Sequence, residues 1–232
     1  MALPYFYIEE LEEQLIVLDE DTSKHMIGVL RMEKGEQVLL TNGKGKKATA
    51  SIIDDNRKKC VVSISEVTLE DRSGIKKSIA ISLVKNVSRF EWFLEKATEM
   101  GVNEIIPMIC QRTEKEKFRH DRMKQILISA MLQSQQCWLP ELHQLTPFLE
   151  VITNCNYEDQ YIAHCLPGQK NSLREAITLE KSAIILIGPE GDFTPEEIEA
   201  SMKNKFHPVA LGDTRLRTET AGIVAAALFC VH

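Results

Sequence analysis

The feature that most constrains the fold is the aliphatic run Ala183–Ile187, which contains no polar position. A strand without a polar face has to be covered on both sides, as the strands of parallel sheets are. Further apolar runs occur at residues 78–84, 104–110 and 161–165, with amphipathic segments between them. Strands that alternate with helices predict an α/β domain with a mainly parallel sheet over residues 73–232.

The first 72 residues show a different pattern. Two alternating runs, residues 37–41 and 47–53, flank the sequence Asn42-Gly43-Lys44-Gly45, which is a strong hairpin signal. A third run follows at residues 60–65, and one helix is expected around residues 21–30. Short strands at this spacing predict a small β-barrel domain in residues 1–72, and the polar segment 70–74 predicts the boundary.

Composition narrows the class of protein. The net charge is -6, the first twenty residues are rich in acidic residues, and the longest apolar stretch, residues 223–231, is too short to span a bilayer. We therefore expect a cytoplasmic protein with no membrane partner. The six cysteines form no CxxC pair, which predicts free thiols and no metal site. Basic clusters within residues 44–59 and 112–124 suit an RNA backbone, and they suit a solvated surface equally well.

The loop Gly188-Pro189-Glu190-Gly191-Asp192 leaves the aliphatic strand and enters a helix. Thr194 at the N-cap, Pro195 at the first helical position and Glu197 at the third predict that helix start. Glycines at the carboxyl end of a strand allow a ligand to approach the backbone. The two acidic side chains of the loop oppose phosphate, so an uncharged or cationic ligand, such as an adenosyl sulfonium, fits better. A plain strand-to-helix turn is the alternative.

A second loop carries Gly212, Arg215 and Arg217, and it precedes an apolar helix at residues 221–229. This helix has almost no polar face, so it must be buried, against the rest of the chain or a second copy. An arginine at a strand end can hold a phosphate or the carbonyl of a base. A surface pair between Arg217 and Glu219 is the alternative. Earlier in the chain, Ser88 is expected to cap a helix that ends at Gly101, with Glu91 completing a capping box.

Taken together, these motifs resemble the ribosomal RNA small subunit methyltransferase E family, which belongs to the SPOUT superfamily. The segments that carry the resemblance are 25–31, 34–36, 89–102, 105–107, 188–191 and 216–221. The resemblance implies a SPOUT-type trefoil-knotted parallel sheet domain, a PUA-like RNA-binding domain at the N-terminus, and a homodimer. It also implies S-adenosylmethionine as cofactor, 16S ribosomal RNA or the small ribosomal subunit as partner, and methylation of a uridine at N3.

The resemblance also implies roles for individual residues. Arg217 would stabilise charge on the uracil oxygens, and Glu219 would position the base or take its proton. Residues implied to bind RNA are His25, Arg31, Arg89 and Arg215. Residues implied to bind the cofactor are His164, Leu166, Ile187, Gly188, Pro189, Glu190, Gly191, Leu211, Gly212, Leu216 and Thr218.

Three other interpretations remain open from the sequence. The chain could methylate another RNA with the same fold, or it could be a non-catalytic RNA-binding factor in ribosome assembly. An unrelated α/β nucleotide-binding enzyme is the third, and the acidic residues of the Gly188 loop disfavour it. Binding of S-adenosylmethionine, measured by calorimetry, separates the assembly factor from the enzymes, because a non-catalytic factor is expected to give no heat.

Overall fold

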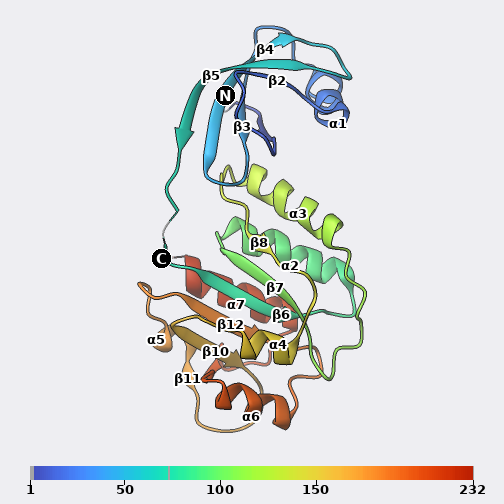
Figure 1. Ribbon diagram of the computed structural model, residues 1–232. Coiled ribbons are helices and arrows are strands. Elements are labelled where there is room, and N and C mark those ends of the chain that lie inside the picture. The colour runs from blue at the N-terminus through green and yellow to red at the C-terminus, as the bar shows by residue number, and fades with distance from the viewer. Residues whose placement is uncertain (1–2, 73, 232) are drawn as a thin grey trace. The chain divides into compact units, whose positions relative to one another are not determined.

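The computed structural model describes residues 3–72 and 74–231, which fold into two compact units. The first unit contains residues 1–72 together with residues 131–139, and the second contains residues 73–130 and 140–232. Figure 1 shows the elements of each unit. In the described part of the chain, no helix has the length and apolar character needed to cross a membrane.

A curled five-stranded sheet forms the first unit (Figure 1). Its strands are β1 (Tyr5–Tyr7), β2 (Leu15–Val17), β3 (Gln37–Thr41), β4 (Lys46–Asp54) and β5 (Val61–Leu69), in the order β1-β3-β4-β5-β2. Only the β1–β3 pair of this sheet is parallel. The predicted hairpin between β3 and β4 is confirmed, and the Asn42 side chain accepts hydrogen bonds from the backbone of Lys44 and Lys46. The core of this unit is hydrophobic and includes Val38 and Leu40 of the sheet together with Met26.

The helix expected at residues 21–30 is α1 (Glu20–Ser23), which continues as a π-helical segment, η1 (Lys24–Val29). Asp19 caps it by accepting a hydrogen bond from the Thr22 backbone at 2.8 Å. Arg31 follows with a φ of 57°, a left-handed conformation that is uncommon for a non-glycine residue. The π-helical segment and the left-handed Arg31 together direct the chain from the helix toward β3.

The segment 131–139 belongs to the first unit although it lies far along the chain. The Leu139 N–H donates to the Gly43 carbonyl at 2.8 Å, and the Gly45 N–H donates to the Cys137 carbonyl at 2.9 Å. These bonds attach the segment to the turn between β3 and β4. The sequence boundary near residue 72 did not anticipate this return of the chain.

The second unit contains a sheet in which every pair of neighbouring strands is parallel. Its order is β11-β13-β10-β12-β6-β7-β8, and β9 also pairs with β7. The predicted α/β class is confirmed. The trefoil threading of the chain stays a prediction. The strands are β6 (Lys77–Ser82), β7 (Glu104–Ile109), β8 (Glu141–Leu142), β9 (Thr146–Pro147), β10 (Asp159–Ala163), β11 (Asn171–Ser172), β12 (Ala183–Ile187) and β13 (His207–Ala210).

Helices cover both faces of this sheet, which explains why β6 and β12 are buried along their whole length. The helices are α2 (Val87–Glu99), α3 (His120–Gln133), α4 (Phe148–Thr153), α5 (Leu173–Ala176), α6 (Pro195–Lys203) and α7 (Thr218–Cys230). On one face, α2 and α7 lie side by side, and Gly222 of α7 approaches Phe93 and Ile81 (Figure 1). On the other, Leu186 clusters with Phe148 of α4.

The start of α2 differs from the sequence prediction. Asn86, and not Ser88, is the N-cap residue, and its side chain accepts a hydrogen bond from the Ser88 backbone at 2.9 Å. The capping box expected between Ser88 and Glu91 is therefore wrong. An asparagine is an equally good cap, and with Asn86 as the cap the helix starts two residues earlier than it would with Ser88.

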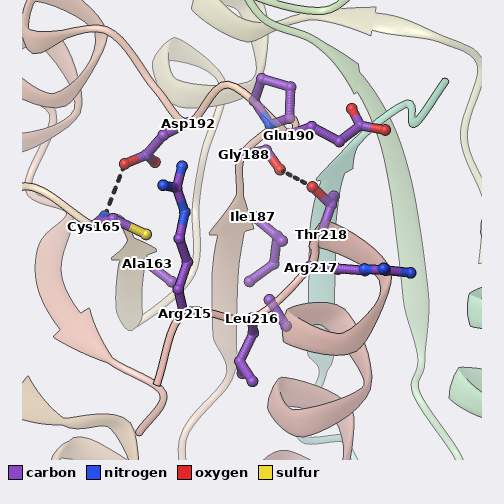
Figure 2. Close-up of a pocket in the computed structure, with 12 residues that line it drawn as sticks. Ala163, Cys165, Ile187, Gly188, Glu190, Asp192, Arg215, Leu216, Arg217 and Thr218 are labelled. Atoms are coloured by element: carbon purple, nitrogen blue, oxygen red, sulfur yellow. Dashed lines mark hydrogen bonds between the residues drawn. The ribbon is translucent and has the colours of Figure 1, made fainter. Parts of the chain in front are cut away.

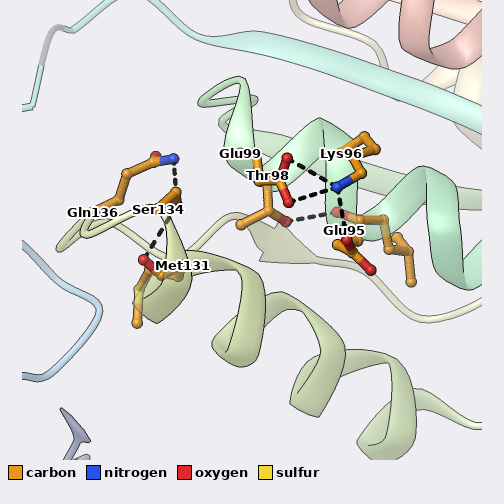
Figure 3. A network of polar contacts seen from close by, with 8 residues as sticks. Glu95, Lys96, Thr98, Glu99, Met131, Ser134 and Gln136 are labelled. Carbon is orange, nitrogen blue, oxygen red and sulfur yellow. Dashed lines mark hydrogen bonds and ion pairs between the residues drawn. The ribbon is translucent and has the colours of Figure 1, made fainter. Parts of the chain in front are cut away.

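Figure 3 shows polar contacts between side chains near the ends of two helices. Near the end of α2, the Lys96 ammonium donates to the Glu99 carboxylate at 2.9 Å. After α3, the Gln136 amide donates to the Ser134 hydroxyl, which in turn donates to the Met131 carbonyl at 3.3 Å. The second set satisfies a carbonyl that the helix itself leaves without a partner.

Candidate functional site

The loops that follow β10, β12 and β13 gather at the carboxyl edge of the parallel sheet, because β10 lies between the other two strands. Two cavities open among them. One of about 550 Å³ lies between the loops after β10 and β13, and we call it the β10 cavity. One of about 280 Å³ lies under the loop after β12 and is called the β12 cavity (Figure 2). They are contiguous, since both are lined by Ala163, Cys165, Arg215, Leu216 and Ala221.

The loop after β12 is held in place from two sides. Its Gly188 carbonyl accepts a hydrogen bond from the buried Thr218 hydroxyl at 2.9 Å (Figure 2). A Cβ on Gly188 would lie 3.1 Å from the Phe193 ring, so glycine allows the loop to pass close to that ring. The helix start predicted at Thr194 is confirmed, and it contains a capping box: the Thr194 hydroxyl accepts from the Glu197 N–H, and the Glu197 carboxylate accepts from the Thr194 N–H. The chain's own contacts therefore hold the conformation of this loop.

The loop after β10 is held by side chains that the sequence did not single out. The Asp192 carboxylate, from a residue with φ 63°, accepts a hydrogen bond from the Cys165 N–H at 2.8 Å. The Lys170 ammonium donates to the carbonyls of His164 and Leu166 at 2.6 and 2.8 Å. Burial, with the nearby Lys170 charge, lowers the pKa of His164. His164 is therefore neutral at physiological pH.

The arginines of the two cavities point in different directions (Figure 2). The Arg215 side chain extends toward Asp192, whereas the side chains of Arg217 and Glu190 point to the opposite side. Arg217 is the N-cap residue of α7, yet its side chain makes no capping hydrogen bond. Within residues 3–72 and 74–231, no carboxylate pairs with Arg217. Its guanidinium is available for a ligand.

Glu219 is 5% exposed, and its carboxylate lies 3.6 Å from the Nε of Arg89 on α2. The surface pair of Arg217 with Glu219, considered as an alternative from the sequence, is not the pair that forms. A buried carboxylate needs a partner, and the α2–α7 packing supplies Arg89 from a residue that is distant in sequence.

Charges in the β12 cavity are mixed. Two carboxylates, Glu190 and Asp192, line it together with Arg215 and Arg217. Both carboxylates accept hydrogen bonds from backbone N–H groups, of Lys85 and of Cys165. A site with no net charge suits a zwitterionic ligand better than a triphosphate, which needs an excess of positive groups.

Most of the residues expected at the cofactor site meet at these cavities. The structure places along the two cavities His164, Leu166, Ile187, Gly188, Pro189, Glu190, Leu211, Gly212, Leu216 and Thr218, with Arg215 and Arg217. Gly191 is absent from both linings, and a Cβ there would lie 3.3 Å from Arg112. The sequence reasoning missed Ala163, Cys165, Lys170, Asp192 and Ala221. Of these, Asp192 stood in the Gly188 loop and Ala221 in the segment 216–221, and these two motifs could have indicated them.

The other expected residues lie elsewhere. His25 and Arg31 are exposed in the first unit, where the His25 ring stands edge-on to Phe6 with the ring centroids 6.0 Å apart. Arg89 lies on α2, beside a different cavity of the second unit. The β10 and β12 cavities therefore unite the expected cofactor residues but leave those expected to bind RNA dispersed.

A group of possible metal ligands lies at the amino end of the strands, away from these loops. Glu104, Glu141 and His143 bring their ligand atoms within 4.8 Å of one another. The His143 Nε2 already bonds the buried Glu104 carboxylate at 2.6 Å, and the Ser78 hydroxyl donates to its other oxygen at 2.8 Å. These contacts account for the group as a hydrogen-bonded ion pair.

Comparison with known proteins gives consistent matches over almost the whole chain. The RNA methyltransferase domain family matches residues 71–230, and the RNA methyltransferase PUA domain family matches residues 18–65. The chain is 26% identical over 215 residues to ribosomal RNA small subunit methyltransferase E of Bacillus subtilis, covering 87% of this chain and 84% of that protein.

Solved structures agree with these family matches. A structure from Porphyromonas gingivalis, described as an rRNA methyltransferase, is 36% identical with a TM-score of 0.91, over 97% of this chain and 95% of that one. Ribosomal RNA small subunit methyltransferase E of Neisseria gonorrhoeae, bound to S-adenosylmethionine, is 27% identical with a TM-score of 0.86, over 97% and 96% of the two chains.

Proposed function

The chain belongs to the RNA methyltransferase family, and from this premise we propose that it transfers the methyl group of S-adenosylmethionine to N3 of a uridine in 16S ribosomal RNA. The observation that carries the proposal is the continuous cavity beneath the loops after β10, β12 and β13. Ligands of open α/β sheets bind at this edge. The names of the relatives, which are methyltransferases of small-subunit ribosomal RNA, support the substrate.

The residues of the two cavities fit S-adenosylmethionine. The β10 cavity, at about 550 Å³, is the size of a small-molecule site, and the β12 cavity extends it. An apolar wall of Leu166, Ile187 and Leu216 suits an adenine ring, and the opposite charges of Asp192 and Arg215 suit the ammonium and carboxylate groups of the methionine part. When bound, this cofactor supplies a methyl group on a positively charged sulfur. The chain contributes backbone groups that Thr218 and Lys170 already fix in place.

Arg217 is the residue proposed to act on the uracil. N3 must lose its proton before or during methylation, and the resulting negative charge spreads onto the neighbouring carbonyl oxygens. Among the residues that the structure describes, the Arg217 guanidinium has no carboxylate partner, and it lies at the edge of the β12 cavity. It can therefore stabilise that charge without first breaking an ion pair. The fixed start of α7 orients its backbone.

Glu219 takes a positioning role in this proposal. Because its carboxylate is buried and faces Arg89, it is poorly placed to accept a proton from the base. Instead it holds Arg89 across the gap between α2 and α7. The group that receives the N3 proton is then water or a group of the RNA itself, reached through the open side of the cavity.

The first unit and the α7 helix provide the expected partner surfaces. His25 and Arg31 are exposed on the unit that matches the PUA domain family, and we propose that they contact RNA. Ile223, Val224 and Leu228 of α7 are only partly buried, which supports a homodimer through this helix. Light scattering of the purified chain at increasing concentration tests the dimer.

A methylation assay with 16S ribosomal RNA or small subunits that lack the modification tests the function, with mass spectrometry to map the product. We expect one methylated uridine, modified at N3, and heat of S-adenosylmethionine binding in calorimetry. Arg217→Ala should lower turnover by about 10²-fold with unchanged cofactor affinity. Arg174→Ala, which removes an exposed arginine of α5, is the matched control. Absence of both the binding heat and any RNA methylation would favour a non-catalytic RNA-binding factor instead.

A further inference from the structure

A third cavity, of about 700 Å³, opens at the start of α2, and we call it the α2 cavity. Its wall includes Lys85, Asn86, Arg89 and Lys115. Glu190 lines both this cavity and the β12 cavity, so the two are neighbours separated by one side chain. A molecule too large for the β12 cavity can therefore extend into the α2 cavity.

Positive charge prevails in the α2 cavity. Three cationic side chains line it, against the carboxylates of Glu114 and Glu190. Both carboxylates are engaged by Lys85: its ammonium lies 2.9 Å from Glu114, and its backbone N–H donates to Glu190 at 2.9 Å. The first turn of α2 contains no acidic residue, so the positive end of its helix dipole is not neutralised there.

Lys115 is the most informative of these side chains. It is partly buried, yet over residues 3–72 and 74–231 no carboxylate forms an ion pair with it. An anionic partner stabilises a cation that has lost part of its hydration. Its neighbour Glu114 faces Lys85 instead, which leaves the Lys115 ammonium to an anion from outside the chain.

Arg89 connects this cavity to the proposed reaction site. Its Nε faces the buried carboxylate of Glu219, two residues from Arg217, while its side chain remains 41% exposed. One ionic contact on the inner side fixes the direction of the guanidinium. An arginine oriented in this way is suited to bind a phosphate oxygen with its outer N–H groups.

We propose that the α2 cavity binds a phosphodiester group of the RNA strand beside the nucleotide whose base enters the β12 cavity. Lys85, Arg89 and Lys115 hold this phosphate, and the shared wall at Glu190 sets its distance from the base. The inference rests on the proposed function, because it takes RNA as the substrate. Contacts to phosphate position a strand without reading its sequence.

The test compares Lys85→Ala, Lys115→Ala and the double variant of the full chain, with 16S ribosomal RNA as the ligand. Lys203→Ala is the matched control, because Lys203 forms a similar exposed pair with Glu199 at 2.7 Å on α6. Each single change should raise the KM for RNA by about fivefold, and the double change by about twentyfold. The kcat at saturating RNA and the affinity for S-adenosylmethionine should not change.

Salt dependence of RNA binding gives the second measurement. Each lost phosphate contact on a single strand reduces the slope of log K against log salt by about 0.7, so the double variant should lose about twice that. Equal slopes and equal KM values for the double variant and Lys203→Ala would overturn the inference. A different result would overturn the proposed function: a wild-type chain that methylates no uridine, whatever the variants do.

Discussion

Replacement of Gly222 by alanine tests how tightly α7 packs against the sheet. A Cβ at this position would lie 2.6 Å from Phe93 Cε2 and 2.9 Å from Ile81 Cδ1. Both partners are completely buried, so neither can move into free space. Overpacking of this kind costs about 1–3 kcal/mol, while alanine in a helix interior returns about 1 kcal/mol relative to glycine. The tight contacts place the expected net loss of unfolding free energy at about 1–2 kcal/mol.

Gly28→Ala is the matched control, because Gly28 is also helical and a Cβ there meets nothing within 4 Å. It should stabilise its own unit by about 0.5–1 kcal/mol. Urea unfolding, followed by far-UV circular dichroism, measures both variants. The start of α7 also holds Gly188 through Thr218, so Gly222→Ala should weaken S-adenosylmethionine binding as well, whereas Gly28→Ala should not.

A double-mutant cycle identifies the cause of the loss. Phe93→Leu removes the ring that Gly222→Ala would strike, so the double variant should be more stable than the sum of the two single effects. Purely additive free energies, or a Gly222→Ala variant as stable as the wild type, would refute the steric argument.

Three further predictions concern local contacts. Thr194→Ala should cost about 1 kcal/mol of unfolding free energy through loss of the capping box, and Thr194→Ser should retain it; equal stability of the two would contradict the cap. Gly45→Ala should destabilise the first unit by at least about 2 kcal/mol, because φ is +86° and the new Cβ would lie 2.6 Å from Trp138 Cε2, and an unchanged melting temperature would be the adverse result. The hydrogen bond that His143 donates to the Glu104 carboxylate raises the pKa of His143, and burial opposes this shift. For Glu104, burial favours a higher pKa, but the hydrogen bonds that it accepts from His143 and Ser78 lower it. Their pair is fully formed between the ordinary pKa values of about 4.5 and 6.5 and is lost as pH rises through the raised pKa, so His143→Asn should destabilise more at about pH 6 than at about pH 9; equal melting shifts at both values would exclude the pair.

The sequence by itself determined the local structure of this protein. Ala183–Ile187 has no polar face, so it had to become a strand covered on both sides, and Thr194 with Glu197 had to start the next helix. Asn42 and Gly43 likewise define the turn between β3 and β4. Each of these outcomes depends on residues within a few positions of one another, and that is why periodicity and capping patterns predict them. Glycines likewise mark the loops after β12 and β13 that are proposed to bind the cofactor.

Tertiary structure decided the contacts between residues that are distant in sequence. Glu219 pairs with Arg89 because α2 and α7 pack side by side, and no spacing rule relates positions 130 residues apart. Lys115 and Glu190 line the same cavity for a similar reason. The order of the strands in the parallel sheet determines which loops lie next to one another. That order depends on the packing free energy of the whole domain. Short sequence motifs thus supply the chemical groups of the site, whereas the residue that pairs with each group is decided only when the chain folds.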